Sequence, residues 1–245
     1  MDFVSGQVLL VDKPLHWTSF DVVKRIRGVL TRRHGCKRFK VGHAGTLDPL
    51  ATGVMLICTG RATKQIDSLQ AGEKEYVATV QLGATTPSFD LETEIDQTFP
   101  TDGLTAEVIE SALEQFRGPI MQVPPVFSAV KVDGKRAYKM ARRGEAPELA
   151  AKSIVISELE LLDFNPATCR ARLRVACSKG TYIRSLARDL GEALGCGGHL
   201  TALRRTRVGN ASIFDCADVV SLIESLKTVE IEIPNDNQPS HNKAN

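Results

Sequence analysis

The sequence predicts an α+β fold in which helices flank a central, largely antiparallel or mixed sheet. Stretches with helical spacing and stretches with strand-like alternation follow one another irregularly along the 245 residues. Several neighbouring strand candidates have no helix between them, whereas a parallel pair needs a long crossover connection. The composition, 42% hydrophobic and 24% charged, is that of a globular protein. No run approaches the ~18 apolar residues of a membrane-spanning helix, so no membrane association is expected.

The chain is expected to begin with a strand over 7–12, followed by a helix that starts near Thr18. Thr18 offers a side-chain oxygen to free N–H groups, and Asp21 places a negative charge at the positive end of the helix. One face of this helix is apolar and the opposite face carries Lys24, Arg25 and Arg27, so the apolar face should be buried. The apolar residues of that face are Val22, Ile26, Val29 and Leu30.

The remaining elements follow from the same patterns. Residues 74–82 alternate between apolar and polar side chains, which indicates a strand with one buried face. Residues 41–53 are rich in Gly, Pro and Thr and are expected to be irregular. The other expected strands are 54–58, 127–132, 153–164, 169–178 and 200–208, and the other expected helices are 105–116, 136–142, 181–194 and 218–226.

The charge is segregated along the chain, although the net charge is only +2. The windows 24–40, 131–143, 170–188 and 203–207 hold 23 of the 31 basic residues, whereas 90–114 is acidic. Each basic window could simply be a solvated face. Clustered Lys and Arg can also bind phosphates whatever the total charge, so the four windows together favour a polyanionic partner.

The six cysteines are scattered, and none forms a C-x-x-C pair. The N-terminus lacks the basic lead and apolar core of a secretory signal, so a cytoplasmic protein with reduced thiols is expected. The histidine and cysteine spacings do not match a structural zinc site, and no metal is expected.

The most informative segment is the loop 42–53, with the sequence GHAGTLDPLATG. Its three glycines allow close backbone approach or positive φ. Asp48 precedes a proline, which favours extended backbone, and leucines on either side can anchor the loop in the core. A carboxylate held in this way can act as a nucleophile or a base, or it can be only a turn residue. His43 could equally be only a hydrogen-bonding residue of the loop.

This loop resembles the signature G-H-x-G-x-L-D-P-x-A-x-G of the TruB family of tRNA pseudouridine synthases. The resemblance extends over about residues 6–210 in five further blocks that occur in the family's order. His16 stands where the family usually has Gly, which affects the shape of the first loop. The five blocks are 13–19 (KPLHWTS), 74–76 (KEY), 123–131 (VPPVFSAVK), 177–186 (CSKGTYIRSL) and 195–205 (GCGGHLTALRR).

The resemblance implies a pseudouridine synthase fold with an active-site cleft across the sheet. It implies isomerisation of uridine 55 in the T loop of tRNA, with no cofactor and no metal. The target uridine must leave its stack to be reached, and an aromatic platform can offset that cost. A tRNA-binding or folding module with incidental or lost catalysis is the alternative, and the intact motif residues argue against it.

The family's site residues can be assigned to matching positions. Asp48 matches the essential aspartate, and Arg184 matches the basic residue that pairs with it and should lower its pKa. Tyr76 matches the aromatic that stacks on the base. Further pocket residues are Tyr182, the apolar wall Leu203, His43 near the flipped nucleotide, and Lys13 as a support.

The resemblance also implies a domain organisation. Residues 1–229 are expected to form the catalytic domain, and 230–245 a polar, disordered tail. Some bacterial relatives continue into an RNA-binding PUA domain, for which no room is expected here. The partner is expected to be the T stem-loop of tRNA, bound by a monomer.

Overall fold

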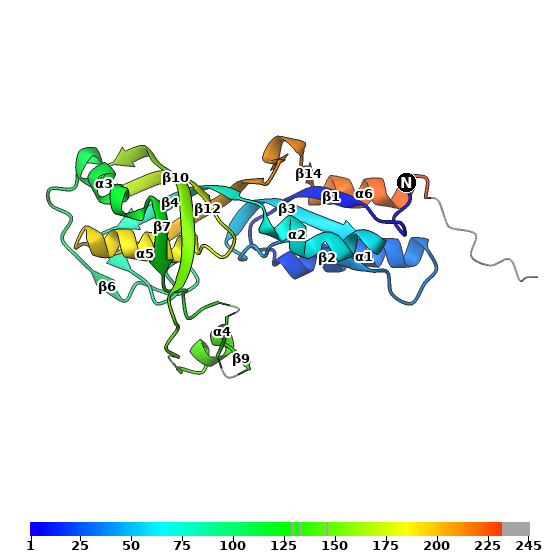
Figure 1. Cartoon of the computed structure of the whole chain (residues 1–245), viewed down its shortest axis with the longest axis horizontal. Helices are drawn as coiled ribbons and strands as arrows, with labels where there is room; N and C mark the ends of the chain where they lie inside the picture. The colour runs from blue at the N-terminus through cyan, green and yellow to red at the C-terminus, as the bar shows by residue number, and fades with distance from the viewer. Residues whose placement is uncertain (129, 133, 146, 232–245) are drawn as a thin grey trace, which may run out of the picture.

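The computed structural model describes residues 1–128, 130–132, 134–145 and 147–231. Within these residues, one ten-stranded sheet runs along the molecule, with the order β14-β1-β3-β12-β4-β11-β10-β7, β2 beside β3 and β13 beside β12 (Figure 1). The pairs β1–β14 and β3–β12 are parallel and the other pairs of this sheet are antiparallel. The predicted α+β fold with a largely antiparallel, mixed sheet is therefore confirmed. Most of the expected tail, 232–245, lies outside the described residues.

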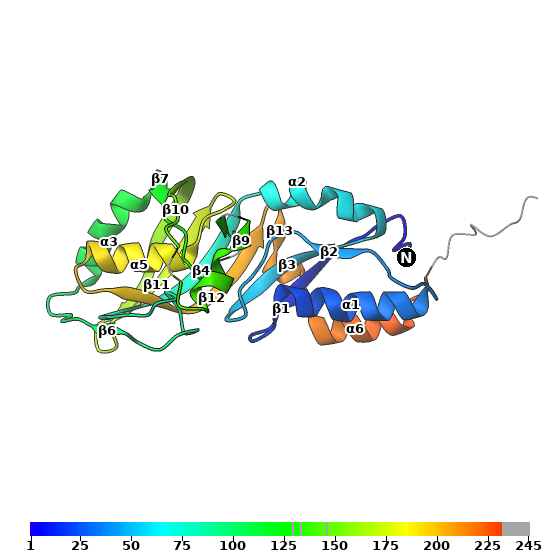
Figure 2. The ribbon, with the colours of Figure 1, turned by 90° about the horizontal axis from the view of Figure 1, so that it is seen from below.

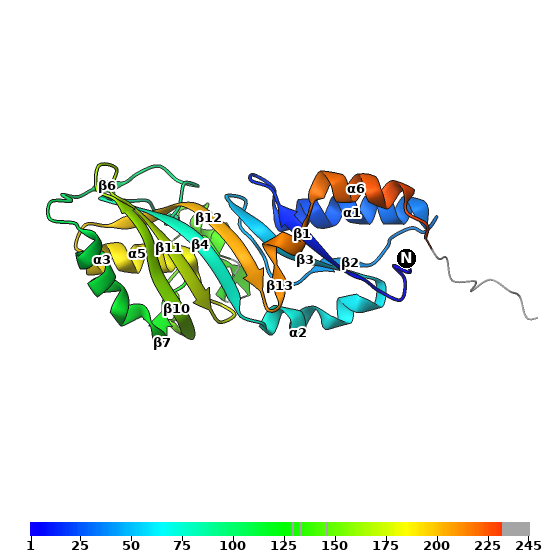
Figure 3. The same cartoon turned by 90° about the horizontal axis from the view of Figure 1, so that it is seen from above.

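In the N-terminal half, the sheet is covered on both faces. The long helix α1 (Ser19–Arg33) lies beside α6 (Val219–Thr228), and α2 (Ile66–Ala71) lies on the opposite side (Figures 2 and 3). Strand β3 (Ala51–Thr59) is buried almost throughout because alternate side chains enter two different cores. Met55 packs with α1 and α6, and Leu56 packs on the other face. Strand β1 (Val8–Lys13) pairs with β3, and β14 (Ala217–Asp218) pairs with β1.

Helix α1 begins as predicted. The side chain of Thr18 accepts a hydrogen bond from the backbone N–H of Asp21, and Asp21 accepts one from the N–H of Thr18. This reciprocal pair satisfies two backbone donors that a helix end otherwise leaves free. The four apolar residues predicted to face the core are all buried.

In the C-terminal half, helices cover only one face of the sheet. Strands β4 (Lys74–Leu82), β11 (Arg170–Cys177), β10 (Lys152–Asn165) and β7 (Gly118–Gln122) bury alternate side chains against α3 (Ala106–Leu113) and α5 (Ile183–Ala193). The other face carries ion pairs, such as those of Arg174 with Glu158 and Glu160 at 2.5 and 2.8 Å.

Strand β12 (Gly198–Val208) joins the two halves. It pairs along β4 and, in parallel, with β3 at only three positions, where Leu203, Arg204 and Arg205 lie beside Ala51, Thr52 and Gly53. A Cβ atom on Gly53 would lie 2.1 Å from the carbonyl oxygen of Arg205, and Gly53 has a φ of +110°. Only glycine fits this close approach without displacing a strand.

An arm projects from the body next to this junction (Figure 1). It contains the hairpin of β8 (Lys131–Val132) and β9 (Lys135–Arg136), followed by α4 (Ala137–Ala141). Five basic side chains gather around a hollow of about 470 Å³ on this arm. They are Lys131, Lys135, Arg136, Lys139 and Arg143.

The structure differs from the predicted elements in several places. Of the strand expected over 127–132, residue 129 lies outside the described residues and only Lys131–Val132 forms a strand. The carbonyls of Phe127 and Ser128 instead accept hydrogen bonds from Arg184 and from the N–H of Tyr138. The stretch 41–53 is irregular only in its centre, since β2 (Val41–His43) and the start of β3 are paired strands. The sequence patterns also missed β7 and α2. They missed three 3₁₀ helices, at Gly60–Gln65, Glu114–Phe116 and Ile213–Asp215. They missed four short strands as well: β5 (Ala84–Thr85), β6 (Gln97–Thr98), β13 (Ala211–Ser212) and β14 (Ala217–Asp218).

None of the described helices is both long and apolar enough to cross a membrane.

Candidate active site

Asp48 lies in the loop between β2 and β3, at the junction of the two halves. Its backbone carbonyl accepts a hydrogen bond from the N–H of Ala51 at 3.0 Å, which closes a tight turn into β3. Leu47 is buried in the core of the C-terminal half, so the loop is anchored beside the carboxylate. The side chain of Asp48 keeps 41% of its surface accessible, so a substrate can reach the carboxylate.

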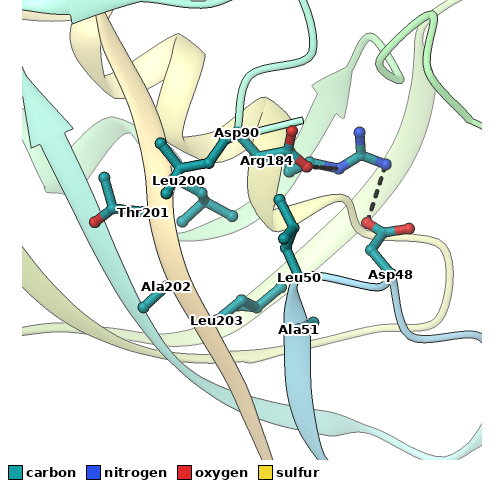
Figure 4. A pocket seen from close by; sticks show the side chains of 10 residues that line it. Asp48, Leu50, Ala51, Asp90, Arg184, Leu200, Thr201, Ala202 and Leu203 are labelled. Carbon is teal, nitrogen blue, oxygen red and sulfur yellow. Dashed lines mark ion pairs between the residues drawn. The ribbon is translucent and has the colours of Figure 1, made fainter. Parts of the chain in front are cut away.

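Arg184 is the ion-pair partner of Asp48. Its Nη2 atom lies 3.0 Å from Oδ2 of Asp48, and its Nε lies 3.6 Å from Oδ2 of Asp90 (Figure 4). The same guanidinium donates to the carbonyls of Ser88 and Phe127 at 3.2 and 2.9 Å. Arg184 is only 5% exposed, so four partners hold it rigidly between two carboxylates.

The pKa of Asp48 is set by two opposing effects. Burial at the floor of the cleft raises the pKa above its ordinary value of 3.8, and Arg184 lowers it. Negative charges on Asp90 and Glu92 raise it further. Arg184 therefore acts in the expected direction, but the net pKa of Asp48 is raised and not lowered. The surrounding protein withholds water from most of the carboxylate, although its outer edge remains accessible.

A cleft of about 310 Å³ opens in front of this ion pair, a volume within the range of small-molecule binding sites. Tyr76 from β4 and Tyr182 before α5 line it together with Leu203 from β12. Burial raises the pKa of both phenols, so both rings stay neutral at physiological pH. The structure thus brings Asp48, Arg184, Tyr76, Tyr182 and Leu203 into one cleft.

The position of Tyr182 is fixed by Gln122, a residue that the sequence patterns did not single out. The N–H of Tyr182 donates to Oε1 of Gln122 at 2.8 Å, and Nε2 of Gln122 donates to the carbonyl of Tyr182 at 3.1 Å. Gln122 is 2% exposed at the end of β7. This two-way contact crosses from the sheet to α5, so no local sequence signal could reveal it.

Lys13 lies behind the loop and is not among the side chains that line the cleft. Its Nζ atom donates to the carbonyls of Pro14, Trp17 and Pro49 at 2.9, 2.6 and 3.4 Å. Burial lowers the pKa of Lys13 to about 8. Lys13 therefore links the segment after β1 to the Asp48 loop, an arrangement compatible with the supporting role expected for it.

His43 lies at the end of β2 and is also not among the cleft-lining side chains. Its Nδ1 atom is buried. Burial lowers its pKa, which keeps the imidazole neutral. Its expected contact with a flipped nucleotide stays a prediction.

The basic windows do not all lie on the surface. Arg205, counted among the phosphate-binding candidates, is 1% exposed and donates to the carbonyls of Val54, Thr46 and Gly45 at 2.7, 3.4 and 3.2 Å. Arg174 is paired with acidic residues on the open face of the sheet. The windows 170–188 and 203–207 are thus partly structural, whereas the arm around α4 keeps its basic side chains exposed.

A reachable carboxylate, paired with a buried guanidinium beside two tyrosines in a cleft, is an arrangement typical of an enzyme active site. Within the described residues, no group of three or more His, Cys, Asp or Glu side chains is gathered as a metal site would require.

Comparison with known proteins identifies the family. A family model described as "TruB family pseudouridylate synthase (N terminal domain)" matches residues 32–183, and one described as "tRNA pseudouridylate synthase B C-terminal domain" matches residues 184–234. The chain belongs to the TruB family of pseudouridylate synthases. The resemblance inferred from its motifs is confirmed.

The curated relatives match the chain over nearly its full length. A protein named tRNA pseudouridine synthase B from Phocaeicola vulgatus is 61% identical over 232 residues, which cover 95% of this chain and 98% of the relative. A protein of the same name from Flavobacterium johnsoniae is 51% identical and covers 92% and 98%.

Solved structures show the same fold. A Cbf5-Nop10-Gar1 complex contains a chain that is 28% identical, with a TM-score of 0.66 over 91% of the present chain. The present chain spans only 55% of that larger chain.

Proposed function

We propose that this chain is a tRNA isomerase that converts uridine 55 of the T loop to pseudouridine. Membership of the TruB family and the names of the full-length relatives support the conversion of a tRNA uridine. The position in the T loop is inferred from the resemblance of the motifs to those of the TruB family.

The observation that carries this proposal is the Asp48–Arg184 ion pair at the floor of a cleft lined by Tyr76 and Tyr182. Isomerisation breaks the bond between N1 of uracil and C1′ of ribose and forms one between C5 and C1′. The reactant and product have the same atoms and oxidation level, so the reaction needs no redox partner. We assign to Asp48 the attack on, or deprotonation of, the ribose, and to Arg184 the placement of the carboxylate.

The cleft walls suit a base that has left its stack. Extrusion of a nucleotide costs a few kcal/mol, and an aromatic platform returns about 1–3 kcal/mol per stacked base. We assign this platform to Tyr76, which is 8% exposed and held at the cleft by β4. Tyr182 and Leu203 would enclose the base, and Lys13 would support the Asp48 loop.

The exposed basic side chains on the arm around α4 supply a surface for the phosphates of the stem-loop. We expect the enzyme to act in the cytoplasm, where tRNA is processed, and to act as a monomer.

The decisive experiment uses purified protein and an unmodified tRNA transcript with no added cofactor, followed by mapping of pseudouridine. Product at uridine 55 is expected. Absence of product under conditions where the tRNA binds would contradict the enzyme proposal and favour the RNA-binding alternative.

Asp48→Asn tests the assignment of the carboxylate. Turnover should be abolished, while tRNA affinity changes by less than about tenfold, which corresponds to roughly 1.4 kcal/mol. If binding collapsed together with turnover, Asp48 would be a structural residue of the loop.

A further inference from the structure

The backbone of the Asp48 loop is held by side chains from three other elements. Five consecutive carbonyls, from Gly45 to Pro49, each accept a hydrogen bond, although the loop has no regular secondary structure. The donors are Arg205 for Gly45 and Thr46 at 3.2 and 3.4 Å, Ser19 for Leu47 at 3.0 Å, the N–H of Ala51 for Asp48 at 3.0 Å, and the N–H of His16 with Lys13 for Pro49 at 2.8 and 3.4 Å.

Ser19 contacts both backbone groups of Leu47, the residue that precedes Asp48. Its Oγ atom accepts a hydrogen bond from the N–H of Leu47 at 2.8 Å and donates to the carbonyl of Leu47 at 3.0 Å. That carbonyl belongs to the planar peptide between Leu47 and Asp48. The hydroxyl therefore fixes the orientation of the peptide from which the Asp48 side chain extends.

The hydroxyl of Ser19 has no role in starting its own helix. Thr18 already caps α1, by accepting from the N–H of Asp21 at 3.1 Å. Ser19 is 4% exposed, and it is not among the side chains that line the cleft. Both hydrogen bonds of the Ser19 hydroxyl go to Leu47, which lies far from Ser19 in sequence.

We propose that Ser19 is a positioning residue for Asp48. Ser19 keeps the Asp48 carboxylate 3.0 Å from Arg184 and does not itself contact the substrate. This inference rests on the proposed function and extends it by one residue. A shift of a reacting group by about 1 Å can reduce a rate by about 10²-fold, so loss of this clamp should act on the chemical step.

The chain offers a matched control at Thr59. Like the hydroxyl of Ser19, the Oγ1 atom of Thr59 bonds both backbone groups of one distant residue. It accepts a hydrogen bond from the N–H of Gln7 at 2.9 Å and donates one to the carbonyl of Gln7 at 3.4 Å. Thr59 is 0% exposed and lies at the end of β3 away from the loop. Ser19→Ala and Thr59→Val therefore remove the same kind of contact, next to Asp48 and remote from it.

The test measures the single-turnover rate on tRNA transcript, the tRNA Kd and the Tm for both variants and the unmodified chain. Ser19→Ala should lower the rate at least tenfold with a Kd within twofold, whereas Thr59→Val should lower only the Tm. An unchanged rate in Ser19→Ala, or equal rate losses in both variants, would overturn the proposal.

Amide hydrogen exchange over 45–50 provides a readout that does not depend on activity. Exchange should be faster in Ser19→Ala and unchanged in Thr59→Val. Unchanged exchange in Ser19→Ala would show that the loop does not need this clamp. If the unmodified chain formed no pseudouridine, the proposed function would fail, and the exchange data would still decide whether Ser19 holds the loop.

Discussion

Arg184 holds Asp48 through Nη2 at 3.0 Å, and the same nitrogen donates to the carbonyl of Phe127, while Nη1 donates to the carbonyl of Ser88 and Nε faces Asp90. The planar, multidentate guanidinium can serve these four partners at once, and an ammonium group cannot reproduce that geometry. The charge on Arg184 and its shape are therefore separate requirements of the site.

Arg184→Lys tests this separation, because the substitution keeps the positive charge and removes the planar guanidinium group. We expect turnover to fall by about 10²-fold or more, the order observed when one positioned donor is removed from an active site. Single-turnover rates and tRNA Kd values check the prediction. Near-normal turnover in the lysine variant would mean that a positive charge alone is sufficient.

The pH dependence of the rate should report the raised pKa of Asp48. If the ionised carboxylate is the active form, activity is lost as pH falls through that pKa. The acidic limb of the plot of rate against pH should therefore lie above pH 3.8. Asp90→Asn removes a charge that raises the pKa and should move the limb to lower pH. Asp163→Asn, at an exposed position on β10, is the control. The limb should not move in that variant; movement to higher pH in Asp90→Asn would contradict the electrostatic account.

The basic arm should account for part of the salt dependence of tRNA binding. Each phosphate contact that is removed lowers the slope of log affinity against log salt by about 1. The triple variant Lys135→Gln, Lys139→Gln and Arg143→Gln should therefore show a clearly smaller slope. Arg174→Gln is the matched control, because Arg174 is neutralised by Glu158 and Glu160. Equal slopes for the triple variant and the unmodified chain would show that the arm is only a solvated surface.

Gly53→Ala should destabilise the fold more than the same change at a glycine with free space around it. Both Gly53 and Gly103 have positive φ, but a Cβ at Gly103 meets nothing within 4 Å. Left-handed backbone costs a non-glycine residue roughly 1–2 kcal/mol, and overpacking adds about 1–3 kcal/mol at Gly53. Denaturant unfolding of the two variants measures the difference. Equal losses would mean that β3 and β12 move apart easily.

The fold was predictable where local patterns decide it. The alternation along β4 and the capping residues of α1 are properties of neighbouring residues, and both are confirmed. The segment 127–132 could not be predicted, because its carbonyls bind partners that are distant in sequence, such as Arg184.

The same distinction applies to the candidate site. The motifs predicted that Asp48, Arg184 and the two tyrosines belong to one site, and the structure places all four in one cleft. The motifs did not reveal that Gln122 fixes Tyr182 or that Asp90 shares Arg184, because these contacts exist only after the sheet has formed. The burial of Arg205 was also hidden, since a run of basic residues on a strand usually predicts exposure.

The three-residue parallel pairing of β12 with β3 has a consequence for the nascent chain. The ribosome adds Asp48 early, but it adds Arg184 and strand β12, whose Arg205 holds the Asp48 loop, long afterwards. A growing chain therefore carries the carboxylate without the groups that place it. The chemistry proposed for this site therefore requires that β12 first enters the sheet between β3 and β4, which were synthesised long before it.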